Sequence, residues 1–157
     1  MIRLERILVP VDFSEYSEKA VRYGIELARG HGSKLYFVHV ISQRVIHAVQ
    51  ELNVRGYKGD FVQAVRKLVQ DKENDLRDFV PQSLYEGIET HFSIRKGSPA
   101  EEVIEASKNL SIDLIVLGSK GHSALASVLI GSVVQKVVNN APCPVLVVRP
   151  LAYESAG

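Results

Sequence analysis

Short apolar runs alternate along this chain with longer segments in which apolar residues recur at helical spacing. Five of the runs are nearly continuous, which is typical of parallel strands whose two faces are both covered. They span residues 6–12, 34–40, 89–96, 112–117 and 144–149. The pattern therefore predicts five strands, each separated from the next by helical sequence.

The intervening segments predict helices over residues 14–30, 60–79, 98–109 and 131–140. Their starts carry capping signals: Ser98 followed by Pro99 suits the first turn of the third helix. The pair Ser132 and Gln135 predicts a capping box at the start of the fourth. Residues 45–52 also keep helical spacing, in the least legible part of the chain.

Strands alternating with helices predict an α/β fold, because parallel strands need long crossover connections and these are usually helical. Right-handed crossovers place helices on both faces of the sheet. No internal repeat, low-complexity segment or composition shift divides the sequence. We therefore expect a single domain over residues 1–157, with a five-stranded parallel sheet between two layers of helices.

Composition narrows the range of functions. The chain has 19 basic and 18 acidic residues, which argues against nucleic-acid binding because that requires a basic surface. No apolar run is long enough to span a bilayer, and the charged N-terminus lacks the features of a secretory signal. The single cysteine, Cys143, cannot form an internal disulfide. We expect a cytoplasmic protein that binds neither nucleic acid nor membrane.

The strongest chemical signal follows the fourth predicted strand, where the sequence reads GSKGHSALASVLIGS. Gly118 and Gly121 would let the backbone adopt positive φ and approach a ligand closely, and successive N–H groups there would form a nest for an anion. Gly131 and Ser132 open a helix whose first N–H groups have no intrahelical partner and favour a phosphate. The apolar residues between the glycines would hold the loop against the core; they are Ala124, Leu125, Val128, Leu129 and Ile130.

Two interpretations of this loop stay open at this point, since its glycines could simply form a turn and a helix start. Position favours a ligand site, because ligands of open parallel sheets lie beyond the carboxyl ends of the strands, where the strand order reverses. Asp12, at the end of the first predicted strand, shares that edge with the loop. Its carboxylate would either contact a ligand or cap the helix that follows.

Several segments in combination resemble the universal stress protein family. They are ILVPVDFSEYSEKA at the start, HVI after the second strand, DLIVLGSKG, and the pattern G-x2-G-x9-G-S followed by VVQKVVNNAPCPVLVVRP. The resemblance extends from Ile7 to Pro150, and only residues 42–87 lack diagnostic sequence. It implies a Rossmann-like, adenine nucleotide alpha hydrolase-like fold with strand order 3-2-1-4-5. The glycine pattern is that of the family's ATP-binding subgroup.

The resemblance also implies which residues hold ATP. The triphosphate would lie against Gly118, Ser119, Gly121, Gly131, Ser132, Val133 and Val134. Asp12 would bond the ribose, and the Val40 backbone would read the adenine edge. The base and sugar pocket would be lined by Pro10, Val11 and Leu117. We hypothesise that Lys120 and His122 touch the outer phosphates, the alternative being that both face solvent. Mg²⁺ would be held mainly by phosphates and water.

The implied function is an ATP-binding sensor or regulator of the stress response, and not a metabolic enzyme. An enzyme of the same fold, with slow ATP hydrolysis, autophosphorylation on Ser119 or Ser132, or adenylation activity, stays open as an alternative. So does a nucleotide-free dimeric interaction module.

Other candidate chemistries find little support in the sequence. The histidines lack zinc-ligand spacing, and there is no Walker A motif and no G-x-S-x-G elbow to support a triad of Ser119, His122 and Asp12. We interpret His39 as a core or pocket-rim histidine.

The last predicted strand, residues 144–149, is expected at the edge of the sheet. Proteins of the resembled family pair this strand across a two-fold axis, so we expect a homodimer. The alternative is that residues 151–157 cover the edge.

Overall fold

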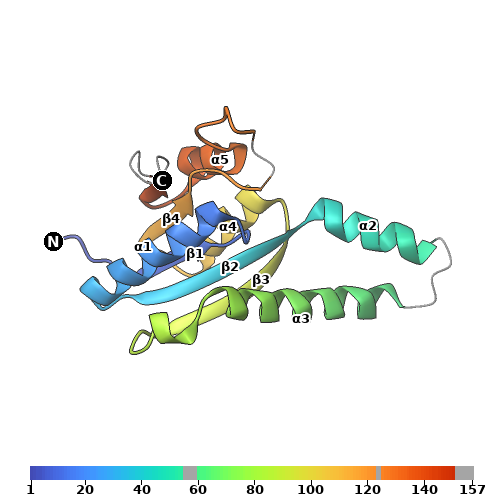
Figure 1. Cartoon of the computed structure of the whole chain (residues 1–157), viewed down its shortest axis with the longest axis horizontal. Helices are drawn as coiled ribbons and strands as arrows, with labels where there is room; N and C mark the ends of the chain where they lie inside the picture. Colours follow the sequence, from blue (N-terminus) through green and yellow to red (C-terminus); the bar gives the residue numbers. More distant parts are fainter. Residues whose placement is uncertain (55–59, 123–124, 151–157) are drawn as a thin grey trace.

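Parallel strands and helices alternate through the computed structural model, which describes residues 1–54, 60–122 and 125–150 (Figure 1). The strands are β1 (Arg6–Pro10), β2 (Lys34–Ser42), β3 (Thr90–Gly97), β4 (Leu114–Gly118) and β5 (Val145–Val148). The helices are α1 (Glu15–His31), α2 (Gln43–Val54), α3 (Phe61–Phe79), α4 (Pro99–Asn109) and α5 (Ser132–Asn140), with a 3-10 turn, η1 (Gln82–Leu84), before β3. Every predicted strand and helix is present, and residues 45–52 lie within α2.

β1 occupies the centre of the sheet, whose order is β3-β2-β1-β4-β5. All neighbouring strands are parallel: Val9 of β1 lies opposite Phe37 of β2, and Leu8 lies opposite Ile115 of β4. The chain moves outward from β1 in one direction and returns to build β4 on the other side. The strand order therefore reverses between β1 and β4, and the expected α/β fold with order 3-2-1-4-5 is confirmed.

Helices cover both faces of the sheet, and each face has its own apolar core. α1 and α3 cover one face, where Phe37 and Leu76 are fully buried. α4 and α5 cover the other, where Val103 and Val137 pack with Leu8 of the central strand. Since both faces are sealed, a ligand can reach the sheet only along its edges.

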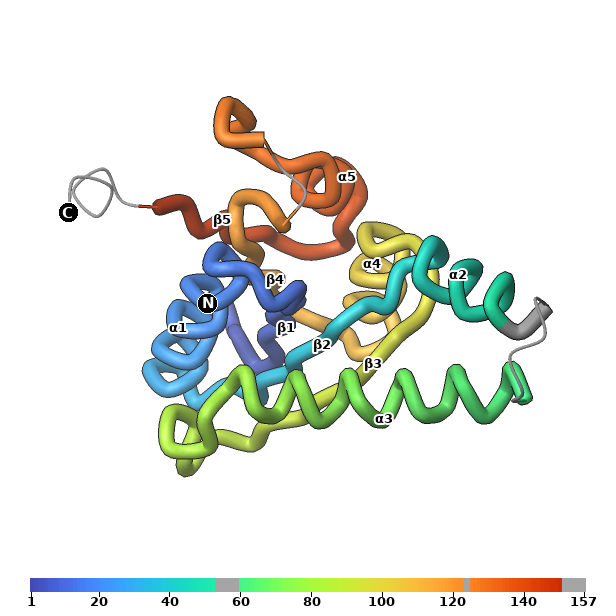
Figure 2. The backbone as a smooth tube through the Cα atoms, turned by 45° about the vertical axis from the view of Figure 1, so that its right-hand side comes forward, coloured from blue at the N-terminus to red at the C-terminus, as the bar shows by residue number. Residues whose placement is uncertain are grey.

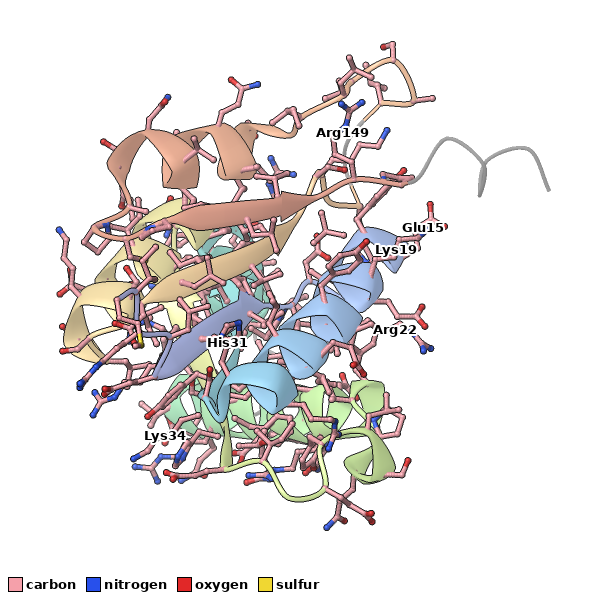
Figure 3. All side chains as sticks on the ribbon, turned by 90° about the vertical axis from the view of Figure 1, so that its left-hand side faces the viewer. Glu15, Lys19, Arg22, His31, Lys34 and Arg149 are labelled. Carbon is pink, nitrogen blue, oxygen red and sulfur yellow. The ribbon has the colours of Figure 1, made fainter. Side chains whose placement is uncertain are left out.

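The orientation of α1 follows from its sequence. Its buried residues recur at helical spacing, while Glu15, Lys19 and Arg22 project from the side turned away from the sheet (Figure 3). Ser14 is the N-cap, and its hydroxyl accepts a hydrogen bond from the N–H of Ser17 at 3.2 Å. The cap fixes where the chain turns after β1.

The starts of α4 and α5 differ from the predicted capping pattern. Ser98 occupies the N-cap of α4 as expected, but its side chain makes no capping hydrogen bond. The N-cap of α5 is Gly131, so the predicted capping box with Ser132 as the cap is wrong. The N–H of Gly131 donates to the carbonyl of Ser119 at 2.8 Å, and this bond starts the helix one residue earlier. Both helices therefore begin without a side-chain cap.

α2 and the first half of α3 lie side by side beyond the end of the sheet, as Figures 1 and 2 show from two directions. In α2 no side chain of the described residues is fully buried, and in α3 only Leu76 is. Across residues 1–54, 60–122 and 125–150, none of the helices has the length and apolar character needed to cross a membrane.

Candidate functional site

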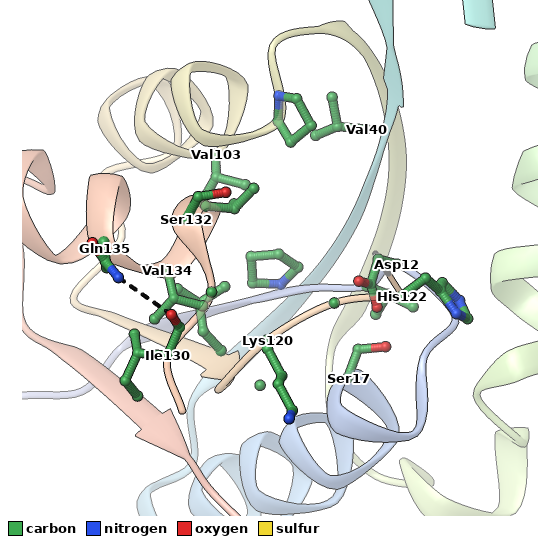
Figure 4. A pocket seen from close by; sticks show the side chains of 18 of the residues that line it. Asp12, Ser17, Val40, Val103, Lys120, His122, Ile130, Ser132, Val134 and Gln135 are labelled. Atoms are coloured by element: carbon green, nitrogen blue, oxygen red, sulfur yellow. Dashed lines mark hydrogen bonds between the residues drawn. The ribbon is translucent and has the colours of Figure 1, made fainter. Parts of the chain in front are cut away.

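A pocket of about 640 Å³ opens at the carboxyl ends of β1, β2 and β4 (Figure 4). Its walls come from the ends of these strands, the first turns of α4 and α5, and the loop between β4 and α5. The pocket lies at the reversal of strand order, where open parallel sheets bind ligands. Its volume falls within the range of about 300–1,000 Å³ that small-molecule sites occupy.

The pocket brings together every predicted site residue except Ser119. Those that line it are Pro10, Val11, Asp12, Val40, Leu117, Gly118, Gly121, His122, Gly131, Ser132, Val133 and Val134. Ser119 is buried, and its N–H donates to the carbonyl of Val148 at 3.0 Å. Its backbone thus holds the loop to β5 and to α5. Ser119 is therefore the one predicted site residue outside the pocket lining.

Asp12 is anchored within the pocket lining by the start of α1. Its Oδ1 accepts hydrogen bonds from the backbone N–H of Ser14 at 3.0 Å and from the Ser14 hydroxyl at 2.5 Å. The N-cap itself is Ser14, so Asp12 supports the cap without being it. Oδ2 lies against Gly121 on the opposite side of the carboxylate. Asp12 therefore has a fixed orientation, with the loop directly above it.

A side chain at any of the three glycines of the loop would meet neighbouring atoms at close range. The prediction of positive φ at Gly118 and Gly121 is wrong, since neither adopts it. A Cβ at Gly118 would lie 2.6 Å from the backbone carbon and oxygen of Tyr16, and one at Gly131 would lie 3.1 Å from the Cα of Lys120. The first contact joins the loop to the start of α1 and the second joins the two ends of the loop, and a local sequence pattern reveals neither.

The side chain of Lys120 bonds to the backbone of its own loop. Its ammonium donates to the carbonyl of Val128 at 3.0 Å and lies 5.2 Å from the centre of the Tyr16 ring, so the side chain runs from the loop toward α1 (Figure 4). The hypothesis of solvent exposure therefore fails for Lys120, which is half-buried, whereas His122 is exposed at the rim. The lysine charge is stabilised by the Val128 carbonyl and the face of the Tyr16 ring.

The apolar residues of the loop were predicted to pin it to the core, and for two of them this is wrong. Leu125 is 72% exposed and Leu129 is 67% exposed. Ile130 does pack against the core beside α4 and α5, and Val128 is half-buried, while Ala124 lies outside the described residues. Two hydrogen bonds also stabilise the loop: the N–H of Gly131 donates to the Ser119 carbonyl, and the Lys120 ammonium donates to the Val128 carbonyl.

The first turn of α5 presents backbone donors to the pocket. Ser132, Val133 and Val134 are its first three residues and all line the cavity. The first intrahelical bond is made by the N–H of Gln135, which donates to the carbonyl of Gly131 at 3.1 Å. The N–H groups of the three preceding residues have no intrahelical acceptor, and the helix dipole adds a partial positive charge there. This end of the pocket favours an anion.

His39 lines the pocket from β2, in agreement with its interpretation as a pocket-rim histidine. Its Nδ1 lies 2.7 Å from the carbonyl oxygen of Val11, and its ring centre lies 4.6 Å from that of Phe13. Burial lowers the pKa of the ring below its ordinary value of 6.5, and the nearby Lys72 lowers it further. The imidazole is therefore neutral at neutral pH.

Comparison with known proteins identifies the family. The profile of the Universal stress protein family matches residues 3–149. The chain belongs to the universal stress protein family. Among the relatives of this universal stress protein, one from Thermus aquaticus is 31% identical over 146 residues, which cover 91% of this chain and 97% of that one.

Solved structures agree with this assignment. Protein MJ0577 of Methanocaldococcus jannaschii superposes with a TM-score of 0.79 at 28% identity, covering 96% of this chain and 99% of that one. A universal stress protein solved in complex with cAMP superposes with a TM-score of 0.61 at 20% identity, covering 92% of this chain and 96% of that one. The second comparison is a likeness of fold.

Sequence reasoning about this universal stress protein missed several lining residues, among them Ser17, Pro99, Val103 and Gln135. All four lie within the first five residues of helices that begin at the carboxyl edge of the sheet. Since that edge was predicted to hold the site, the helix starts themselves were an available signal.

Metal-binding side chains do not gather in the described part of this universal stress protein. Within residues 1–54, 60–122 and 125–150, no group of three or more histidine, cysteine or acidic side chains is placed to hold a metal ion. Asp12 is the one carboxylate among the described lining residues. A divalent cation at this site would need ligands from a bound molecule and water.

Proposed function

We propose that this universal stress protein binds ATP in the pocket at the carboxyl edge of its sheet and acts as a regulator of the stress response. One observation carries the proposal. A single pocket contains the uncapped first turn of α5, the fixed carboxylate of Asp12 and an open edge of β2 at Val40. These three features match the phosphates, the sugar hydroxyls and the base of a nucleotide.

The edge of β2 at Val40 suits adenine. β1 pairs with β2 only as far as Pro10 opposite Val38, and the N–H of Val11 then donates to the carbonyl of Val38 at 2.8 Å. Backbone groups of alternate residues point to the same neighbouring strand, so those of Val40 point to the side where β1 has ended. An N–H and a C=O presented together match a ring nitrogen and the adjacent amino group of adenine.

The first turn of α5 suits the phosphates. The N–H groups of Ser132, Val133 and Val134 and the helix dipole all favour negative charge at one place. Lys120 lines the same pocket, and a phosphate could replace the carbonyl of Val128 as the acceptor of its ammonium. Mg²⁺ would then bind to phosphate oxygens and water, which fits the single carboxylate, Asp12, among the described lining residues.

The same lining supports a regulator rather than a metabolic enzyme. Asp12 is already engaged by two hydrogen bonds from Ser14, and His122 lies exposed at the rim. Neither has the environment of a general base placed beside a phosphate. A relative of the same fold has been solved with cAMP, which supports this class of ligand for the fold.

We further infer that the protein is a cytoplasmic homodimer paired through residues 144–149. β5 is an edge strand, and Leu146 on it is 36% exposed. An apolar edge strand favours pairing with a second copy. The single cysteine needs no oxidising compartment.

Two variants at one position test the phosphate end of the proposal. Gly131 has φ −73° and ψ 162°, a conformation suited to the residue before proline, and proline is tolerated at the first helical position. Ser132→Pro therefore removes one N–H and the hydroxyl while keeping α5, whereas Ser132→Ala removes only the hydroxyl. We expect Ser132→Pro to weaken ATP binding about tenfold or more relative to Ser132→Ala, at equal melting temperatures. Equal affinities in a calorimetric titration would contradict the proposal.

A further inference from the structure

Phe13 directly follows Asp12 and has a backbone conformation that a bulky residue rarely adopts. Its φ is 67°, in the left-handed region, where the side chain of an L-residue crowds the neighbouring backbone. Among the described residues other than glycine, only Ser111 shares a positive φ. Such a conformation persists when the surrounding structure compensates for it. The contacts of Phe13 should therefore show what holds it.

The aromatic ring of Phe13 is held by β2 and α3. Its centre lies 4.6 Å from that of His39 on β2 and 5.5 Å from that of Phe79 on α3, the latter edge to face at 83°. The ammonium of Lys72, also on α3, lies 5.4 Å from the ring centre. Both kinds of contact are favourable for an aromatic ring. The side chain is thus anchored in the apolar core on the α1 and α3 side of the sheet.

The backbone of Phe13 turns the chain around Asp12. The N–H of Ser14 donates to Oδ1 of Asp12 at 3.0 Å, which closes a turn with Phe13 at its centre. On the other side of Asp12, the carbonyl of Val11 accepts a hydrogen bond from Nδ1 of His39 at 2.7 Å. Both neighbours of Asp12 are therefore held from β2, and the carboxylate has one direction, against the loop after β4.

We propose that Phe13 is a positioning residue whose anchored ring maintains the left-handed backbone that holds the Asp12 carboxylate in the pocket lining (Figure 4). The inference rests on the proposed function, since it concerns how Asp12 is presented to the nucleotide. Phe13 is not among the described residues that line the pocket, so it acts through Asp12. Because α3 supplies Phe79 and Lys72 to the ring, the same residue connects α3 to the ligand site.

Two variants separate the backbone role of Phe13 from simple packing. Phe13→Gly removes the whole side chain but adopts a positive φ freely, whereas Phe13→Val keeps apolar volume on a β-branched residue that strongly disfavours it. Loss of packing alone would therefore harm Phe13→Gly more. We expect the opposite order in calorimetric titrations with ATP. The wild type should bind most tightly, and Phe13→Val should bind about fivefold or more weakly than Phe13→Gly. Phe13→Ala takes the place of Phe13→Val if that variant does not fold.

The same pair in an Asp12→Ala background shows whether the effect passes through the carboxylate. With no carboxylate to position, Phe13→Gly and Phe13→Val should bind ATP equally. Phe92→Val is the matched control, because Phe92 is a half-buried ring that stacks on Phe37 at 5.4 Å and does not belong to the described pocket lining. It should lower the melting temperature and leave the affinity for ATP unchanged.

Amide hydrogen exchange measures the turn without any nucleotide. The amide of Ser14 should exchange faster in Phe13→Val than in Phe13→Gly, because its acceptor on Asp12 is displaced. Binding of ATP by Phe13→Val as tight as by Phe13→Gly would overturn the inference, and so would a difference that persists without the Asp12 carboxylate. Either result leaves the proposed function intact. Absence of ATP binding by the wild type would overturn the proposed function, and this inference with it.

Discussion

Gly121 lies directly against Asp12, and a Cβ added at position 121 would overlap the carboxylate oxygen Oδ2. The other oxygen, Oδ1, is held by the N–H and hydroxyl of Ser14. The carboxylate therefore sits between the start of α1 and the loop after β4. A side chain at position 121 would therefore have to displace the Asp12 carboxylate, so the glycine keeps that carboxylate in place.

Replacing Gly121 by alanine should thus disable Asp12. We expect Gly121→Ala to displace the carboxylate and to weaken ATP binding about tenfold or more, the range for losing a hydrogen bond to a charged group. Gly30→Ala is the matched control, since a Cβ there meets nothing within 4 Å and the residue lies near the end of α1. Calorimetric titration of both variants measures the effect. Unchanged affinity in Gly121→Ala would separate Asp12 from the ligand.

The elements of this fold were predictable from sequence because they depend on local patterns. Apolar runs and helical spacing located every strand and helix, including α2. What local patterns did not reveal are close approaches between distant segments. Gly118 packs on the backbone of Tyr16, and Gly131 on Lys120, so these glycines meet a packing need and keep negative or extended φ.

For two leucines of the loop, the local pattern predicted burial that the structure does not show. Leu125 and Leu129 belong to an apolar stretch that predicted burial, yet both are largely exposed, and Leu125 lines the pocket. The turn that carries them is held at its ends by backbone and lysine hydrogen bonds, which do not depend on those side chains. Most of the predicted site residues, in contrast, line one pocket, because the position of the carboxyl edge of a parallel sheet follows from topology alone.

Removing the charge of Lys120 should loosen the loop. Lys120→Met keeps the length of the side chain but loses the bond to the Val128 carbonyl and the contact with the Tyr16 ring. We expect faster amide hydrogen exchange at residues 125–131 and a stability loss of about 1 kcal/mol. Lys120→Arg should restore protection, because a guanidinium can make both contacts. Equal exchange rates in wild type and Lys120→Met would contradict the role of Lys120 as the internal closure of the loop.

The lowered pKa of His39 predicts how stability depends on pH. In the unfolded chain the ring titrates near 6.5, and in the folded protein at a lower pH because burial and Lys72 disfavour its charged form. The unfolded state therefore binds more protons below about pH 6.5, so this contribution to stability is present above that pH and is lost as the pH falls. Urea unfolding between pH 8 and pH 5.5 should show a smaller decline in His39→Asn than in the wild type. An identical decline in both proteins would contradict the assignment of a neutral, buried His39.

A charge on β5 should dissociate the proposed dimer. Leu146→Lys places an ammonium on the exposed side of this edge strand, where a second copy would pair. We expect sedimentation analysis to show a dimer for the wild type and a monomer for Leu146→Lys, since charged side chains on an edge block strand pairing. Val62→Lys on α3 is the control, as Val62 is 50% exposed and lies away from β5. A dimer that persists in Leu146→Lys would place the interface elsewhere.

We propose that the pocket binds an adenine nucleotide and that the free edge of β2 at Val40 recognises its base. Calorimetric titration of the wild type with ATP and with GTP, both with Mg²⁺, tests it most directly. We expect saturable binding of one ATP per chain and binding of GTP weaker by about tenfold or more, because a guanine carbonyl would face the backbone C=O of Val40 without a donor. Equal affinities would contradict recognition of adenine at this edge, and no binding of either nucleotide at millimolar concentration would contradict the nucleotide site itself.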